Sequence, residues 1–291
     1  MLLTLSALAI AVAAAAPSTT SALLVATKDV DSLKDALLLD VRPADAYTAA
    51  HVPGALNLDV SALSETRDNV AGLLKPLDQV RKALGDAGVD VNKRIVVYSA
   101  MDKASDISSA ARMFWILEYI GYEKVAVLDG GFTKWQAESR KTEAGASTAK
   151  PVVVPALKIR EDRLATMDNI GLAIKGKSAT IVDARGAEYF KGEKNADVVK
   201  KAGHLPGAVN MPVETCVSDT SALKSWDELK QIAASSKVGG DAPVITYCNT
   251  GRSASAAYLV LRLLGYENVA MYDGSMAEWT NDDSRPVETN K

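Results

Sequence analysis

The sequence predicts an α/β protein made of two tandem copies of one domain, each a mainly parallel sheet flanked by helices. Short apolar strand patterns alternate with helical patterns along the chain, which is typical of parallel α/β sheets. Five sequence blocks recur in the same order in the two halves. At 291 residues the chain is long enough for two domains of ordinary size.

The N-terminal segment looks like an export signal. Residues 1–16 form an apolar run rich in Leu and Ala that is too short for a comfortable membrane span, and small and polar residues follow. The run has no preceding Lys or Arg, and Pro17 obstructs cleavage after Ala16, so we expect cleavage near Ala22. Residues 1–22 are therefore expected to be a signal peptide, and the protein to be exported to the periplasm. The alternatives are an uncleaved anchor and a misassigned start codon.

The repeated blocks define the duplication. Their spacing is far longer than the period of a solenoid repeat, so each copy is a domain and not a stacking unit. The matched segments are residues 38–42 with 181–185, 51–57 with 204–210, 96–98 with 245–247, 121–125 with 265–269, and 128–135 with 272–279.

In the second copy, short β-branched and apolar runs predict strands at residues 181–183, 208–211, 244–247 and 269–272. Helical spacing of apolar residues predicts helices at 225–235 and 253–264. Between the copies, residues 141–157 are rich in small residues and carry two prolines, which predicts a partly extended linker. The domains are then residues 23–140 and 158–291.

Composition excludes several classes of function. The chain is 48% hydrophobic and 24% charged, as in soluble globular proteins. A net charge of −3 with no basic cluster gives no electrostatic reason to bind nucleic acid. The two cysteines, Cys216 and Cys248, are too few for a disulfide framework or a Cys-rich zinc site. No metal or organic cofactor is implied.

Cys248 is the best candidate for a reactive group. It ends the strand expected at residues 244–247, and the polar loop residues Asn249, Thr250, Gly251, Arg252 and Ser253 follow before the next helix. Loop N–H groups that converge at a helix N-terminus bind anions, and a thiol there, with Arg252 close by, should favour the nucleophilic thiolate. The alternative is a buried, inert cysteine at the end of a strand.

The repeated Asp-x-Arg, His-x-Pro-Gly-Ala-x-Asn and Asp-Gly-(Gly/Ser)-x-x-x-Trp blocks, with the Tyr-Cys loop of the second copy, resemble the two-domain rhodanese sulfurtransferases of the thiosulfate/3-mercaptopyruvate type. The resemblance covers nearly all of the chain after the N-terminal segment. It implies that residues 158–291 form the catalytic domain, with Cys248 as the nucleophile, and that residues 23–140 form a non-catalytic copy. Ser99 stands at the position of Cys248 in that copy, and residues 100–106 after it form a longer, acidic loop.

The charges near Ser99 and the small number of histidines are consistent with a non-catalytic first domain and a catalytic second domain. Asp102 and Asp106 would repel an anionic substrate near Ser99. The two histidines of the chain, His51 and His204, lie in the repeated turns, where we expect structural hydrogen bonds, so no histidine is left for a dyad or triad. Sulfur transfer from thiosulfate needs no general base, because sulfite leaves as a stable anion. A persulfide on Cys248 would then pass its sulfur to cyanide or to a thiol.

Two arginines are candidate substrate ligands. Arg185 matches the family arginine that helps to bind the anionic group of the substrate, although it could instead pair with Asp183, as Arg42 could with Asp40. Arg252 has no counterpart in the first copy and is the better candidate. With Asn249, Thr250, Gly251 and Ser253 they make up the expected substrate-binding set.

The loop departs from both family types that it resembles. Loops of the mercaptopyruvate type are neutral after the cysteine, and vertebrate thiosulfate enzymes have two adjacent cations, whereas this loop has Arg252 alone. The single cation favours thiosulfate, with 3-mercaptopyruvate as the alternative donor. Ser275 replaces the second glycine of its block, in a turn that we expect to lie away from the loop.

Other functions remain open at this stage. A phosphatase or arsenate reductase places its arginine six residues after the cysteine, where this chain has Ala254. A non-catalytic persulfide carrier for one partner protein is a second alternative. The expected partners are a small-molecule sulfur donor and a thiol or cyanide acceptor, with a thioredoxin-like dithiol protein as a further acceptor. We expect a monomer with no stable membrane span.

Overall fold

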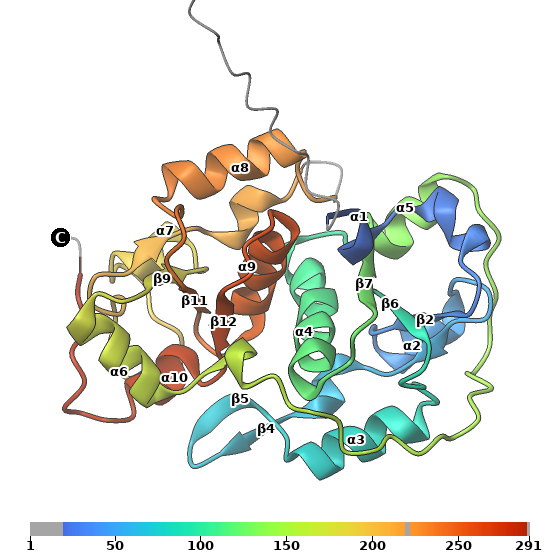
Figure 1. Ribbon diagram of the computed structural model, residues 1–291, viewed down its shortest axis with the longest axis horizontal. Helices are drawn as coiled ribbons and strands as arrows, with labels where there is room; N and C mark the ends of the chain where they lie inside the picture. Colours follow the sequence, from blue (N-terminus) through green and yellow to red (C-terminus); the bar gives the residue numbers. More distant parts are fainter. Residues whose placement is uncertain (1–19, 219–221, 290–291) are drawn as a thin grey trace, which may run out of the picture.

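Each half of the chain forms a five-stranded sheet in which every pair of neighbours is parallel (Figure 1). The computed structural model describes residues 20–218 and 222–289. The first sheet has the order β1-β7-β6-β2-β3 and the second the order β10-β9-β11-β12-β8. Read from opposite edges, the two orders correspond strand for strand, so the predicted duplicated α/β fold is confirmed.

The central strands are largely apolar because helices cover both sides of each sheet. Those of the first sheet are β1 (Leu24–Val25), β2 (Ala36–Asp40), β3 (Leu56–Asn57), β6 (Arg94–Tyr98) and β7 (Val125–Leu128). Those of the second are β8 (Leu164–Ala165), β9 (Thr180–Asp183), β10 (Val209–Asn210), β11 (Val244–Tyr247) and β12 (Val269–Tyr272).

The helices follow the same duplicated plan. The first half contains α1 (Thr20–Leu23), α2 (Ala44–Ala49), α3 (Leu77–Asp86), α4 (Ala104–Ile120) and α5 (Gly131–Ala137). The second contains α6 (Met167–Gly176), α7 (Ala187–Phe190), α8 (Trp226–Ser235), α9 (Arg252–Leu263) and α10 (Ser275–Trp279). Short 3₁₀ turns occupy Thr27–Ser32, Val60–Leu63, Glu161–Arg163 and Val213–Cys216.

Helices α4 and α9 pack side by side where the two domains meet (Figure 1). Helix α4 is buried almost all round, because a sheet lies on one side of it and α9 on the other. One hydrophobic core runs across the junction. Buried Glu118 of α4 accepts hydrogen bonds from Tyr258 (2.6 Å) and Arg262 (3.2 Å) of α9. Such a continuous interface holds the two domains in one relative position.

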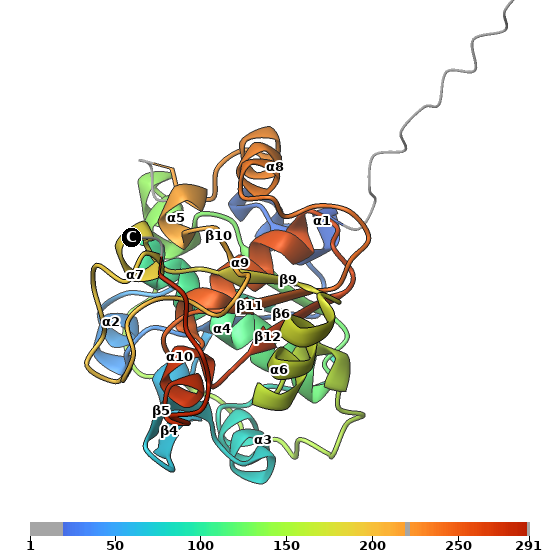
Figure 2. The ribbon, with the colours of Figure 1, turned by 90° about the vertical axis from the view of Figure 1, so that its left-hand side faces the viewer.

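The hairpin of β4 (Ser64–Arg67) and β5 (Val70–Leu74) is a feature of the first domain that the sequence analysis missed. Asp68 and Asn69 at its turn both have positive φ, 52° and 62°, as a tight two-residue hairpin turn requires. In both ribbon views the hairpin lies beside α10 of the second domain (Figure 1 and Figure 2). In the second copy, an isolated antiparallel bridge between Val217 and Leu223 follows the matching 3₁₀ turn.

The predicted elements of the second copy are present, and none of their bounds differs from the prediction by more than one residue. The strand expected at 208–211 is shorter, and the helix expected at 253–264 begins one residue earlier, at Arg252. Ser225 caps α8 through a reciprocal bond with Glu228. Residues 144–160 contain no helix or strand and run along the first domain.

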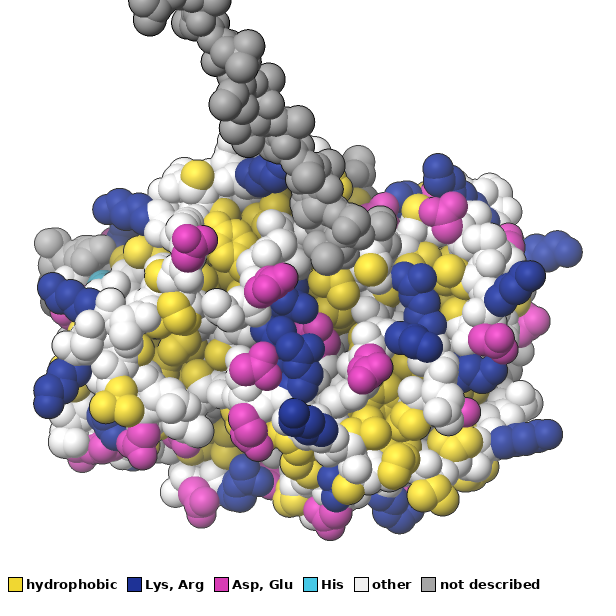
Figure 3. Space-filling model, in the orientation of Figure 1, with side chains coloured by type: hydrophobic (Ala, Val, Ile, Leu, Met, Phe, Trp, Pro, Cys, Tyr) yellow, Lys and Arg dark blue, Asp and Glu magenta, His cyan; other side chains and the backbone are white. Residues whose placement is uncertain are grey.

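The surface and the N-terminal region add two observations. On the face in Figure 3, Lys and Arg side chains are interspersed with Asp and Glu. No helix among residues 20–218 and 222–289 is long and apolar enough to cross a membrane. Most of the expected signal segment, residues 1–19, lies outside the described residues.

Candidate active site

Cys248 lies at the C-terminal end of β11, where a tight loop leads into α9. Its side chain is buried, with 3% of the residue exposed. Gly251, the last loop residue before the helix, has φ +79°, and a Cβ there would lie 2.8 Å from the carbonyl oxygen of Asp273 and 2.9 Å from Nη1 of Arg112. Only glycine fits, so the loop is held close to the protein interior.

Ser275 anchors this loop. The N–H groups of Cys248 and Gly251 both donate to its Oγ at 3.1 Å, and the hydroxyl donates to the Tyr272 carbonyl at 2.8 Å. Our expectation that the Ser275 turn lies away from the loop is wrong. Because β11 and β12 are parallel neighbours, the loops at their C-terminal ends meet at one edge of the sheet. Ser275 keeps the left-handed backbone (φ 51°) that Gly131 has in the first copy (φ 54°).

The other loop amides are free to bind an anion. The carbonyls of Cys248 and Asn249 accept hydrogen bonds from the N–H groups at the start of α10, at 3.1 and 3.0 Å. No acceptor within the described ranges binds the backbone N–H groups of Asn249, Thr250, Arg252 and Ser253. With the N-terminus of the 12-residue α9, they form a site of partial positive charge beside the thiol.

Arg185 is held mainly by its own domain. It is buried, and its Nε and Nη2 bind the carboxylate of Asp183 at 2.9 and 2.6 Å. Burial alone lowers the pKa of Arg185, but the hydrogen bonds and charge of Asp183 outweigh it, and the pKa is raised. The same arrangement joins Arg42 to Asp40 in the first copy. The pairing of Arg185 with Asp183, which we gave as the structural alternative, is therefore confirmed. Arg185 nevertheless reaches the loop, because its Nη1 donates to Oδ1 of Asn249 at 3.1 Å.

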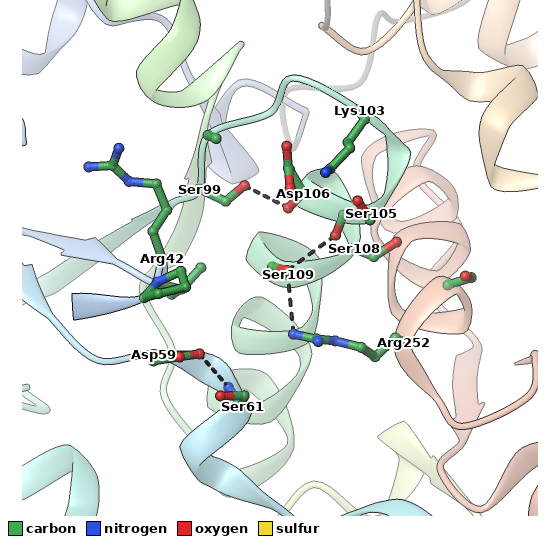
Figure 4. A pocket seen from close by; sticks show the side chains of 14 residues that line it. Arg42, Asp59, Ser61, Ser99, Lys103, Ser105, Asp106, Ser108, Ser109 and Arg252 are labelled. Carbon is green, nitrogen blue, oxygen red and sulfur yellow. Dashed lines mark hydrogen bonds between the residues drawn. The ribbon is translucent and has the colours of Figure 1, made fainter. Parts of the chain in front are cut away.

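The Arg252 side chain extends into a cavity of about 510 Å³ between the domains (Figure 4). Its Nη2 lies 3.4 Å from Oγ of Ser109 on α4, and no carboxylate of the described residues pairs with it. Partial burial of the guanidinium, and then the charge of Arg112, lower the pKa of Arg252, but a guanidinium remains protonated at neutral pH. The charged lining residues are Arg42, Asp59, Lys103, Asp106 and Arg252, with Ser61, Ser99, Ser105, Ser108, Ser109 and Ser253 as hydroxyl groups.

The equivalent position in the first domain is closed. The Ser99 hydroxyl donates to the carbonyl of Asp106 at 2.6 Å (Figure 4). Asp106 lies in the first turn of α4, so the acidic segment 100–106 is partly helical and not the long loop that we expected. Sequence reasoning missed Asp59, Lys103 and Ser109 as cavity residues, because only the packing of the two domains brings them beside Arg252.

The two histidines and Cys216 have structural surroundings. His51 and His204 stack on aromatic rings at 3.8 Å and bind main-chain oxygens through Nδ1 at 2.9 and 2.7 Å, which confirms their expected role. Cys216 is fully buried in an apolar cluster, and burial raises its thiol pKa to about 11. Neither cysteine forms a disulfide. No group of His, Cys, Asp and Glu among the described residues could hold a metal ion.

Comparison with known proteins gives a consistent answer. The model of the rhodanese-like domain family matches residues 24–138 and 167–282. The chain is 32% identical to 3-mercaptopyruvate sulfurtransferase from Escherichia coli K12, covering 86% of this chain and 87% of that protein. It is 30% identical to thiosulfate sulfurtransferase from Azotobacter vinelandii, covering 88% and 92%.

Solved structures show the same fold. SseA from Escherichia coli, described as a 3-mercaptopyruvate sulfotransferase, has a TM-score of 0.76 and 29% identity, covering 87% of this chain and 98% of that one. A variant of EanB in complex with ergothioneine has a TM-score of 0.83 over 94% of this chain and 71% of that one, but at 24% identity it shows the fold alone.

Proposed function

We propose a persulfide mechanism for this chain, which belongs to the rhodanese family of sulfurtransferases. In the proposed reaction, the Cys248 thiolate attacks the outer sulfur of thiosulfate. A bond forms between the two sulfur atoms, the S–S bond of thiosulfate breaks, and sulfite leaves with the electron pair. Cyanide or a thiolate then attacks the outer persulfide sulfur, and the Cys248 thiolate is released.

The observation that supports this proposal most directly is that four unpaired loop N–H groups follow a buried thiol within five residues of the chain. Preorganised N–H groups stabilise a negative sulfur where little water can reach. The reaction needs no proton transfer by the enzyme, which agrees with the absence of a free histidine among the described residues.

Thiosulfate as the donor is supported by Arg252. Its guanidinium adds one positive charge to a cavity that adjoins the loop, and it has no carboxylate partner among the residues described. A guanidinium with free donors binds oxyanions such as the sulfonate end of thiosulfate. 3-Mercaptopyruvate is the second candidate donor. It is favoured by the neutral residues Asn249 and Thr250 and by the Escherichia coli relative.

The decisive experiment compares thiosulfate and 3-mercaptopyruvate as donors, with cyanide and a dithiol as acceptors, in the wild type and in Cys248→Ser. We expect turnover with a preference for thiosulfate, a gain of one sulfur atom on Cys248 after donor alone, and loss of both in Cys248→Ser. Residual turnover above a few per cent in the variant would contradict the assignment of Cys248 as the nucleophile.

The remaining parts of the proposal concern cellular context. The apolar segment 1–16 supports export to the periplasm with cleavage near Ala22. A monomer that delivers sulfur to a thioredoxin-like dithiol protein is a further part of the proposal. N-terminal sequencing of protein from fractionated cells tests the export. A protein that forms the persulfide but turns over no small acceptor would instead be a persulfide carrier for one partner.

A further inference from the structure

We infer that the non-catalytic domain positions the catalytic loop through its β4–β5 hairpin, with Gly72 of β5 as the positioning residue. Gly72 has φ +85°, and a Cβ on it would lie 2.7 Å from the Thr250 carbonyl oxygen and 2.9 Å from the Thr250 Cβ. Nonbonded atoms do not lie so close together, so a side chain at residue 72 would force β5 or the loop to move. The backbone of β5 therefore rests directly on the loop that follows Cys248, an approach that only glycine allows.

A buried ion pair between the domains supports the loop beside this contact. Nη1 of Arg112, on α4, lies 2.6 Å from Oδ1 of Asp273, which follows β12. Arg112 also donates from Nη2 to the Gly72 carbonyl at 3.1 Å, and Asp273 accepts the Leu74 N–H at 2.8 Å. A Cβ on Gly251 would lie 2.9 Å from both members of the pair.

The loop is thus enclosed by parts that the first domain supplies. Thr250 meets the hairpin, and Gly251 meets the Arg112–Asp273 pair that fixes the hairpin to the second domain. Arg112 is 1% exposed, and its Nε has no hydrogen-bond partner within the described chain. An unpaired buried N–H is unfavourable for stability, so stability alone does not explain Arg112 at this position.

The consequence is that the loop amides depend on the position of the first domain. The Thr250 carbonyl shares a peptide unit with the Gly251 N–H, which donates to Ser275, and the free N–H groups of Thr250 and Arg252 lie in the peptide units on either side. A displacement of this carbonyl therefore tilts the central unit and shifts the two neighbours that carry the free N–H groups. A misplacement of about 1 Å at a reacting centre can lower a rate by about a hundredfold. The hairpin therefore sets the geometry in which the Cys248 sulfur is held.

The test is Gly72→Ala, with Gly265→Ala as the matched control. Gly265 has a similar backbone (φ +91°), but a Cβ there would meet no atom within 4 Å. Both changes carry the same left-handed strain, and only the first pushes on the loop. We expect Gly72→Ala to lower kcat about 10- to 100-fold and to slow alkylation of Cys248 by iodoacetamide about 3- to 10-fold. Gly265→Ala should keep both within about twofold.

A second variant separates positioning from general damage. Thr250→Gly removes one of the two atoms that the new methyl group would strike and frees the loop to adjust. In the Gly72→Ala background it should recover part of the lost alkylation rate, although alone it lowers activity, so the two effects are not additive. If Gly72→Ala does not fold, Asn281→Ala replaces it, because the half-buried Asn281 side chain donates to the Asn69 carbonyl at the hairpin tip (3.3 Å).

The outcomes distinguish this inference from the proposed function on which its activity readout rests. Alkylation of Cys248 needs no sulfur transfer. A wild type that uses neither donor defeats the proposed function, whereas the alkylation comparison still tests the hairpin. Equal kcat and equal alkylation rates in Gly72→Ala and Gly265→Ala, or in Asn281→Ala and the wild type where that replacement is needed, overturn the inference.

Discussion

Removing the hydroxyl of Ser275 should destabilise the protein and loosen the catalytic loop. In Ser275→Ala, the buried N–H groups of Cys248 and Gly251 lose their shared acceptor, and the Tyr272 carbonyl loses a donor. A buried group left without a partner costs about 1–3 kcal/mol, so two such N–H groups predict a loss of about 2–6 kcal/mol in unfolding free energy. Alanine keeps the strained backbone (φ 51°), so the change isolates the hydroxyl.

Urea unfolding and donor kinetics measure the two effects. Ser108→Ala is the control for stability, because Ser108 is also a buried serine but donates only to the helical carbonyl of Ala104. We expect Ser108→Ala to cost less than about 1 kcal/mol and Ser275→Ala to lower kcat at least about tenfold. An unfolding midpoint and a kcat equal to those of the wild type in Ser275→Ala would refute the role of the hydroxyl as the anchor of the loop.

Ser275→Gly gives an internal check on the same reasoning. Glycine also lacks the hydroxyl, but it adopts a positive φ without the steric penalty of a Cβ. A left-handed residue with a side chain costs about 1–2 kcal/mol, so Ser275→Gly should be more stable than Ser275→Ala by about that amount. Since both variants leave the loop N–H groups unanchored, their kcat values should be similar.

The remaining predictions concern charge. Arg252→Ala should lower kcat/KM for thiosulfate about 10- to 100-fold, through the loss of one charge-assisted contact of about 1.5–3 kcal/mol, and Arg252→Lys should recover part of it in steady-state assays. Arg185→Ala and Arg42→Ala should each destabilise by about 3–5 kcal/mol in urea, because each leaves a buried aspartate unpaired, and Arg185→Ala should also change donor kinetics. Burial raises the pKa of the Cys216 thiol from 9.0 to about 11. Burying the neutral thiol therefore makes its full contribution to the free energy of unfolding below pH 9, and this contribution is lost as the pH rises from 9 to 11. The stability difference between the wild type and Cys216→Ala should therefore shrink by about 2–3 kcal/mol over that range.

Features that depend on neighbouring residues in the chain could be predicted from the sequence. The buried strand before Cys248, the polar loop and the Asp-x-Arg forks follow from apolar runs and from charges two residues apart, and all are present. The turn at Asp68 and Asn69 also has a local signal, since both residues tolerate positive φ, and a closer reading could have found the hairpin.

Contacts between distant segments could not be predicted in this way. Leu74 and Asp273 are 199 residues apart and meet only because α4 packs on α9. Nothing in the sequence around Gly72 indicates that its neighbour is Thr250. The direction of the Arg252 side chain has the same origin, because Ser109 on α4 belongs to the other domain. The sequence of one repeat therefore indicates the loop after Cys248, but it does not indicate which residues of the other repeat contact that loop.

The duplication explains why the enclosing parts come from the copy without a cysteine. Helices α4 and α9 follow equivalent strands, β6 and β11, so packing one helix against the other brings the loop before each to a shared cavity. Arg112 and Gly72 are in contact with the catalytic loop, whereas the Ser99 hydroxyl donates to its own domain. By geometry the first domain is then part of the proposed active site, and changes at Gly72 should affect the chemistry of a thiol in the other half of the chain.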